Sequence, residues 1–135
     1  MEIDDPAVVA EVVAAFTRYE RALVANDLAT VDELMWRDDR TVRVGPDDRQ
    51  DGYDAIRAFR RSLARQTPPR SLTETVVVTF GADAAVVTTT FVPTDGSVPG
   101  RQQQTWVRLD GGWRIVAAHV SLATSQIAQT ADQQP

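Results

Sequence analysis

The sequence predicts an α+β fold in which about three N-terminal helices pack on a strongly curved, mostly antiparallel sheet, forming a cone-shaped roll that encloses a pocket. Two observations indicate this architecture: apolar residues recur at helical spacing in the first half of the chain, and four long segments rich in Val and Thr fill the second half. A third observation indicates the pocket. One of these segments opens with three consecutive glutamines and the next carries the only histidine, where close packing would favour apolar side chains.

Two helices are expected in the first 35 residues. Asp5 and Pro6 begin the first one, because aspartate is a favoured N-cap and proline suits the first helical position. Its apolar stripe consists of Val9, Val12, Val13, Phe16, Tyr19 and Leu23. Asn26 is suited to end this helix, and Asp27 to cap a second, shorter one. The second helix would bury Val31, Leu34 and Met35.

A strand, a loop and a third helix are expected next. Residues 40–45 alternate apolar and polar side chains, as a half-buried strand does. Residues 46–52 are rich in Asp, Gly and Pro, which is typical of a loop. Residues 53–66 fit a helix with a buried line of Ile56, Phe59 and Leu63, ended by the two prolines that follow.

The rest of the chain is predicted to be β-structure. Four strands are expected, at residues 72–80, 84–93, 101–109 and 113–124. No repeat or linker indicates a second unit, so residues 1–125 are expected to form a single domain. Residues 126–135 are polar and are expected to be a frayed tail.

Composition excludes several kinds of chemistry. The 135-residue chain has no cysteine, and all 14 of its basic residues are arginine, so thiol nucleophiles, disulfides and lysine Schiff bases are excluded. One histidine cannot supply a multi-imidazole zinc site, and no metal or cofactor is expected. The net charge of −5 argues against nucleic acid as a partner. The chain shows no long apolar run or leader segment, so no membrane contact is expected and the expected location is the cytoplasm.

Three segments carry a family resemblance, namely YERALVANDLATVDELMW, RTVRVGPDDRQDGYDAIRAFR and GRQQQTWVRLDGGWRIVAAHVSL. Together they resemble the AtzH-like family, which includes the oxalurate-catabolism protein HpxZ, within the SnoaL-like (nuclear transport factor 2-like) cone-fold superfamily. The resemblance covers roughly residues 8–125. The third segment is shared loosely by many SnoaL-like proteins, so the first two supply the specificity.

The resemblance implies an enzyme of nitrogen catabolism, a decarboxylating amidohydrolase. Its substrate would be a small dicarboxylated urea, such as 1,3-dicarboxyurea converted to allophanate, or an oxalurate-like amide. A tyrosine of the first helix and an arginine of the first strand are tied to activity in that family, and they match Tyr19 and Arg43. The fold often forms dimers, so a homodimer is expected. Gln103 stands where the family commonly has serine, which leaves the size of the pocket and the substrate open.

Tyr19 and Arg43 each have a structural alternative. Tyr19 lies on the apolar stripe of its helix, so it is either a core tyrosine or a phenol aimed into the cone beside Arg43. Arg43 alternates with two valines, which on parity alone favours an exposed side chain, whereas the resemblance favours the pocket. A guanidinium there would bind a carboxylate through two hydrogen bonds. Glu20, next to the tyrosine, is a candidate to orient Arg43.

Five further residues are candidates for substrate binding: Arg60, Gln103, Gln104, Trp106 and His119. Arg60 is either a second carboxylate clamp or a rim arginine that passes the core to reach water. The glutamine amides are expected to bind a urea group inside the cone or to meet across a dimer sheet. His119 is either a structural residue or the one side chain that ordinarily titrates near neutral pH.

Two other functions are open. The protein could be a non-catalytic binding protein that assists a separate amidase. It could also be an isomerase or dehydratase resembling ketosteroid isomerase, although such a site needs a carboxylate base in an apolar cone, and arginines with amides fit that poorly.

Overall fold

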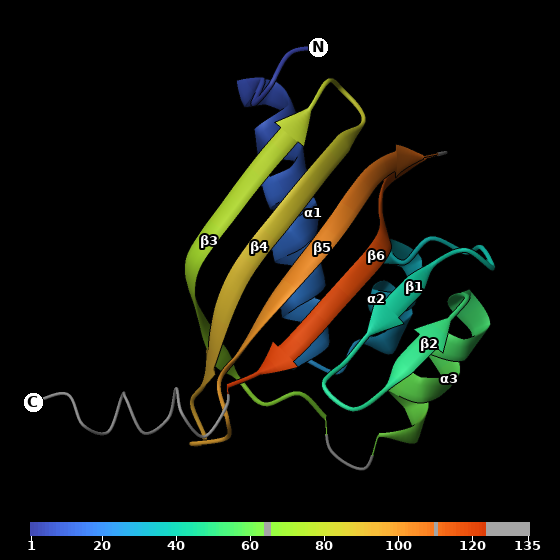
Figure 1. The fold of residues 1–135 in the computed structure, drawn as a ribbon, viewed down its shortest axis with the longest axis vertical. Coiled ribbons are helices and arrows are strands. Elements are labelled where there is room, and N and C mark those ends of the chain that lie inside the picture. Colours follow the sequence, from blue (N-terminus) through green and yellow to red (C-terminus); the bar gives the residue numbers. More distant parts are fainter. Residues whose placement is uncertain (64–65, 110, 124–135) are drawn as a thin grey trace, which may run out of the picture.

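The computed structural model describes residues 1–63, 66–109 and 111–123. Within these ranges, three helices pack on a six-stranded mixed sheet with the strand order β2-β1-β6-β5-β4-β3. Figure 1 shows helix α1 behind the long strands, with α2 and α3 beside the short strands β1 and β2. The predicted α+β cone-type fold is therefore confirmed. No helix in the described ranges is both long and apolar enough to cross a membrane.

The two N-terminal helices begin and end as predicted. α1 spans Pro6–Val24, and the Asp5 side chain accepts a hydrogen bond of 2.9 Å from the backbone N–H of Ala7. The helix ends with Asn26 in the left-handed conformation (φ 56°), and the backbone N–H of Asp27 donates to the carbonyl of Ala22 at 2.8 Å. α2 spans Leu28–Leu34, and Asp27 caps it by accepting from the backbone of Thr30.

The middle of the chain differs from the prediction. α3 spans Tyr53–Ser62 and ends earlier than expected, because Leu63 is already extended (ψ 129°). β1 is only Val42–Val44, and the predicted loop contains a second short strand, β2 at Arg49–Asp51, paired antiparallel with β1. The sequence did not reveal β2 because a three-residue strand with one buried, polar side chain has no apolar alternation.

The four long strands agree with the prediction to within about two residues at each end. They are β3 at Arg70–Phe80, β4 at Ala84–Pro93, β5 at Gly100–Leu109 and β6 at Gly112–Leu122. Each pairs antiparallel with the next, while β1 pairs parallel with β6 and makes the sheet mixed. Residue 110 of the predicted turn and the predicted tail at 126–135 lie outside the described residues.

The core lies between α1 and the inner face of the sheet. Val12 of α1, Trp106 of β5 and Ile115 of β6 have no exposed surface. The Tyr19 ring meets the Trp106 ring edge to face, with centroids 6.4 Å apart. This packing holds one turn of α1 against the strand that carries the glutamines.

A β-bulge in β6 reverses which side chains face inward. Thr105 pairs with Ala117 while Trp106 pairs with Ile115, so Val116 is an extra residue on β6. Before the bulge, Ile115 points to the core. After it, Ala118 and Val120 face inward and His119 faces outward.

Candidate functional site

A cavity of about 180 Å³ opens between the helices and the inner face of the sheet, and we call it the inner cavity. Its apolar lining includes Leu23, Met35, Phe59 and Val120. Its polar lining consists of Tyr19, Arg43, Arg60, Arg70, Gln102 and Gln104. These polar residues come from α1, β1, α3, β3 and β5, so the cavity exists only once helices and sheet have packed.

Tyr19 and Arg60 meet in this cavity. The Arg60 guanidinium donates a hydrogen bond to the Tyr19 hydroxyl oxygen at 3.3 Å. Because the oxygen accepts that bond, the hydroxyl proton stays available to a bound molecule. The phenol was expected beside Arg43. Both line the cavity, but the guanidinium that contacts the hydroxyl belongs to Arg60.

Arg43 faces the cavity and is held from the side of β2. Its side chain is only 12% exposed, and the guanidinium lies 4.7 Å from the Phe59 ring centroid. It donates to Asp48 at 2.7 Å and to Gln50 at 3.0 Å. Gln50 also donates to Asp48, and this bond, followed by the contact with Arg43, holds the pKa of the Asp48 carboxyl below its usual value. Asp48 therefore orients Arg43.

Glu20, the carboxylate expected to orient Arg43, binds Arg70 instead. Arg70 donates to both carboxylate oxygens, at 2.8 and 3.1 Å, and its guanidinium lies over the Phe91 ring. Gln102 joins the pair by donating to Glu20 at 2.7 Å and accepting from Arg70 at 3.1 Å. The Arg70 and Glu20 side chains are 7% and 10% exposed, so this is a buried, mutually satisfied network. Nothing in the sequence indicated that Arg70 belongs to the site. This residue directly follows the two prolines that end the helical pattern and precedes the predicted strand, so no periodic pattern includes it.

Gln104 and Trp106 act together, but only Gln104 lines the cavity. The Trp106 indole N–H donates to the Gln104 side-chain oxygen at 3.0 Å. Because an indole can only donate, this bond directs the amide nitrogen of Gln104 away from the indole, where it is free to donate into the cavity. Trp106 itself is fully buried, so the prediction that it contacts a substrate is wrong. Its indole instead holds the side-chain amide of Gln104 in place.

Gln103 and His119 lie on the opposite face of the sheet. They are paired neighbours on β5 and β6, both exposed, and the Gln103 amide donates to Thr88 at 3.1 Å. Their expected place in the wall of the pocket is therefore wrong for the cavity of this chain. For His119 the cause is the bulge at Val116, because unbroken alternation along β6 would place His119 on the same face as Trp113 and Ile115.

The electrostatics of the site leave one guanidinium without a counter-charge. Arg43 is paired with Asp48 and Arg70 with Glu20. In the part of the chain that the structure describes, no carboxylate pairs with Arg60, and its buried Nε has no hydrogen-bond partner. The arrangement therefore suits a small anion. Across the same described ranges, no cluster of three His, Cys, Asp or Glu side chains could hold a metal ion.

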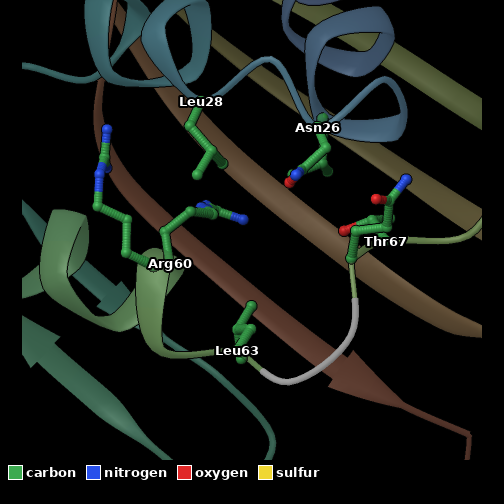
Figure 2. A pocket seen from close by; sticks show the side chains of 8 residues that line it. Asn26, Leu28, Arg60, Leu63 and Thr67 are labelled. Atoms are coloured by element: carbon green, nitrogen blue, oxygen red, sulfur yellow. The ribbon is translucent and has the colours of Figure 1, made fainter.

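A second hollow adjoins the first and shares Arg60 with it. This outer pocket measures about 270 Å³ and is lined by residues of the α1–α2 turn, of α3 and of the segment that follows α3. Figure 2 shows Arg60 facing Leu28, with Asn26 and Thr67 across the pocket and Leu63 at its edge.

Solved structures of other bacterial proteins resemble this chain in fold. A protein of the DUF3225 family from Pectobacterium atrosepticum is 48% identical, with 90% of this chain and 95% of that chain covered and a TM-score of 0.86. A cystatin-like fold protein from Burkholderia xenovorans is 49% identical, with 92% and 98% covered and a TM-score of 0.87. A nuclear transport factor 2-like protein from Pseudomonas putida is 20% identical, with 97% and 99% covered and a TM-score of 0.76, which shows the fold alone. Among curated proteins, none matches.

The match to a family model agrees with the resemblance that the three sequence segments carry. The AtzH-like model matches residues 1–126, which include every element described above. The two structures near 50% identity match this chain over nearly the same length. The chain therefore belongs to the AtzH-like family, within the nuclear transport factor 2-like fold.

Proposed function

We propose that this protein is a decarboxylating enzyme that acts on a small carboxylate-bearing urea or amide held in the inner cavity. The conversion of 1,3-dicarboxyurea to allophanate is the favoured reaction, because membership of the AtzH-like family suggests it. The observation that carries the proposal is the Tyr19 hydroxyl, held by Arg60 inside a cavity that Arg43 also lines. A volume of about 180 Å³ suits a molecule of this size rather than a steroid-sized one.

The reaction requires that one proton be delivered to the nitrogen that loses the carboxylate. When the N-carboxylate leaves as carbon dioxide, the C–N bond breaks and its electron pair stays on nitrogen, which must then be protonated. In this proposal the Tyr19 hydroxyl gives that proton, and the Arg60 guanidinium stabilises the phenolate that remains. Water returns a proton to Tyr19, so one proton is consumed for each carbon dioxide released.

Arg43 and Gln104 would position the substrate. The Arg43 guanidinium stays charged at any working pH and can hold the departing carboxylate at the cavity wall. The amide nitrogen of Gln104 can donate to the urea carbonyl. Asp48 and the Trp106 indole keep these two groups in place.

An isomerase resembling ketosteroid isomerase is less well supported. Such a reaction needs an unpaired carboxylate as base, whereas Glu20 and Asp48 are each bound by an arginine that lines the cavity. A binding protein that assists a separate amidase has more support, since among the described residues no carboxylate or imidazole that could activate water lines the inner cavity. We also propose that the protein forms a homodimer.

The test is the release of carbon dioxide and allophanate from 1,3-dicarboxyurea, measured against the spontaneous rate. Tyr19→Phe should lower kcat/KM by about a hundredfold or more, because it removes the proton donor. Arg43→Ala should lower it by at least about tenfold, because it removes a charge-assisted contact.

Each variant has a matched control. Tyr53→Phe removes the other tyrosine hydroxyl, which also accepts from an arginine but lies outside the inner cavity. Arg40→Ala removes a nearby arginine whose side chain is 78% exposed. Both controls should keep activity. No acceleration over the blank by the wild type would reject the reaction, and carboxylate binding without turnover would favour the accessory role.

A further inference from the structure

Arg60 stands at the boundary between the inner cavity and the outer pocket. Both hollows are lined by Leu23, Arg60, Leu63 and Thr67, so they adjoin over a shared wall. Arg60 is the one charged residue in that wall. The Arg60 side chain is therefore placed to contact a molecule in either hollow.

The neighbouring arginine shows what is unusual about Arg60. Arg61 also lines the outer pocket, but its guanidinium is bound at 2.6 and 3.2 Å by Asp32 of α2, a carboxylate that Arg57 also approaches at 3.4 Å. Arg60 has only the Tyr19 hydroxyl as a partner within the described residues, and its Nε is buried without any acceptor. Arg60 is partly buried, and a guanidinium in such a place without a counter-charge favours the binding of an anion.

The far side of the outer pocket carries two polar side chains, those of Asn26 and Thr67. Asn26 is locked in the left-handed conformation by the two backbone hydrogen bonds that end α1, one from its own N–H to Leu23 and one from Asp27 to Ala22. Its amide and the Thr67 side chain lie across the pocket from Arg60 (Figure 2). An amide and a hydroxyl can donate to carboxylate oxygens that a guanidinium holds from the other side.

We propose that the outer pocket is a second carboxylate subsite, in which Arg60, with Asn26 and Thr67, binds the carboxylate that the substrate keeps. The departing carboxylate lies in the inner cavity at Arg43, beside the Tyr19 hydroxyl. This rests on the proposed function and specifies its substrate class: a short, linear molecule with two carboxylates that spans both hollows. Arg60 then has two roles, as the specificity residue for the second carboxylate and as the partner of Tyr19.

The experiment compares stable dicarboxylates with monocarboxylates of the same carbon number by isothermal titration calorimetry. Malonate is set against propionate and succinate against butyrate. The wild type should bind at least one dicarboxylate about tenfold or more tightly than its matched monocarboxylate. Arg60→Gln should reduce this preference to below about twofold, and Arg60→Lys should leave an intermediate one, because a lysine keeps the charge without the forked donors.

Two controls locate the effect. Arg61→Gln changes the adjacent arginine of the same pocket and should leave the preference unchanged, because the guanidinium of Arg61 is already bound to a carboxylate, that of Asp32. Asn26→Gly keeps a left-handed backbone at the helix end and removes only the side-chain amide. It should therefore lower the affinity for dicarboxylates several-fold and change the affinity for monocarboxylates little. The preference is a ratio within one variant, so a partly unfolded sample lowers both affinities equally.

The outcomes separate this inference from the proposed reaction. No preference in the wild type, or an unchanged preference in Arg60→Gln, would overturn the subsite even if 1,3-dicarboxyurea is turned over. A preference lost in Arg60→Gln and kept in Arg61→Gln would support the subsite even if no turnover is found. An equal loss in both arginine variants would indicate general attraction of anions and would also overturn it.

Discussion

Glu20 and Arg70 form a residue pair whose stability depends on both members. Their side chains are nearly buried, and Arg70 donates to both carboxylate oxygens while Gln102 completes the set. A buried pair contributes little net stability, because the loss of hydration offsets most of the attraction. Removing one member is different, since the other charge stays buried without a partner. Arg60 has no carboxylate partner in the ranges that the structure describes, which fits its proposed role in binding a ligand carboxylate.

At this scale we predict that Glu20→Ala lowers the free energy of unfolding by about 3–5 kcal/mol, because it leaves the Arg70 guanidinium buried and unpaired. The matched control is Glu33→Ala, which breaks an ion pair with Arg18 in which both side chains are about half exposed. That control should cost about 1 kcal/mol or less. Urea denaturation followed by circular dichroism measures both. Equal losses in the two variants would contradict the account of the buried network.

At the scale of elements, strand β5 and the bulge in β6 decide which side chains meet the cavity. On β5 the alternation is unbroken, so Gln102 and Gln104 are buried on the inner face and Gln103 is exposed on the outer one. On β6 the extra residue Val116 shifts the alternation by one position. The side chains beyond the bulge therefore lie on the face opposite to the one that counting from Trp113 predicts.

Because Gln103 and Gln104 lie on opposite faces of the sheet, we predict that substituting them has different effects on ligand binding. Gln104→Leu should weaken the binding of small carboxylate-bearing amides about three- to tenfold, because it removes a donor from the cavity wall. Gln103→Leu changes the next residue in the same way on the other face and should alter binding less than about twofold. Calorimetric titration with malonamate, a mono-amide, measures both. A larger loss for Gln103→Leu would show that the outer face contributes to the site.

Over the whole molecule, contacts between arginine and carboxylate side chains are spread across the surface. The net charge of −5 comes from 19 acidic and 14 basic residues. Contacts with arginine lower the pKa of several carboxyls, and the hydrogen bond from Arg40 lowers the pKa of Asp38 to about 2. The pKa of Asp51 is lowered by Arg49, and that of Asp48 by Gln50 and then Arg43. The folded state therefore stays ionised at pH values where the unfolded chain takes up protons.

The sign of the pH dependence follows from these lowered pKa values. Each such carboxyl contributes stability that is fully present above its unfolded pKa of about 4 and is lost as the pH falls through its folded pKa. We expect Tm to decrease on acidification below about pH 5, and Asp38 to contribute to that decrease down to about pH 2. Differential scanning calorimetry from pH 7 to pH 2.5 measures it. Asp38→Asn should flatten the most acidic part of the curve, and a Tm that is constant from pH 5 to pH 3 would contradict the expectation.

The sequence predicted most of the fold because most of its signals are local. The Asp5 cap, the stop at Asn26 and the Val- and Thr-rich strands each depend on neighbours within a few residues, and the structure confirms them. The prediction was wrong where the signal is short or polar. β2 has three residues and no apolar alternation, and α3 ends at Ser62 although its helical pattern continues.

From the sequence alone we could predict every element except β2, most of the buried face of α1 apart from Val13, which is 42% exposed, and the availability of an arginine- and amide-rich site. Which carboxylate pairs with which arginine becomes known only from the folded structure. Asp48 pairs with Arg43 across a turn, while Glu20 pairs with Arg70, fifty positions away in the sequence. The folded structure also places Arg60 against Tyr19, with no carboxylate partner among the residues that it describes, and turns His119 outward. The physical reason is that helix and strand preferences act between near neighbours. Ion pairing and strand register depend on the distances between segments that approach each other only after the chain has folded.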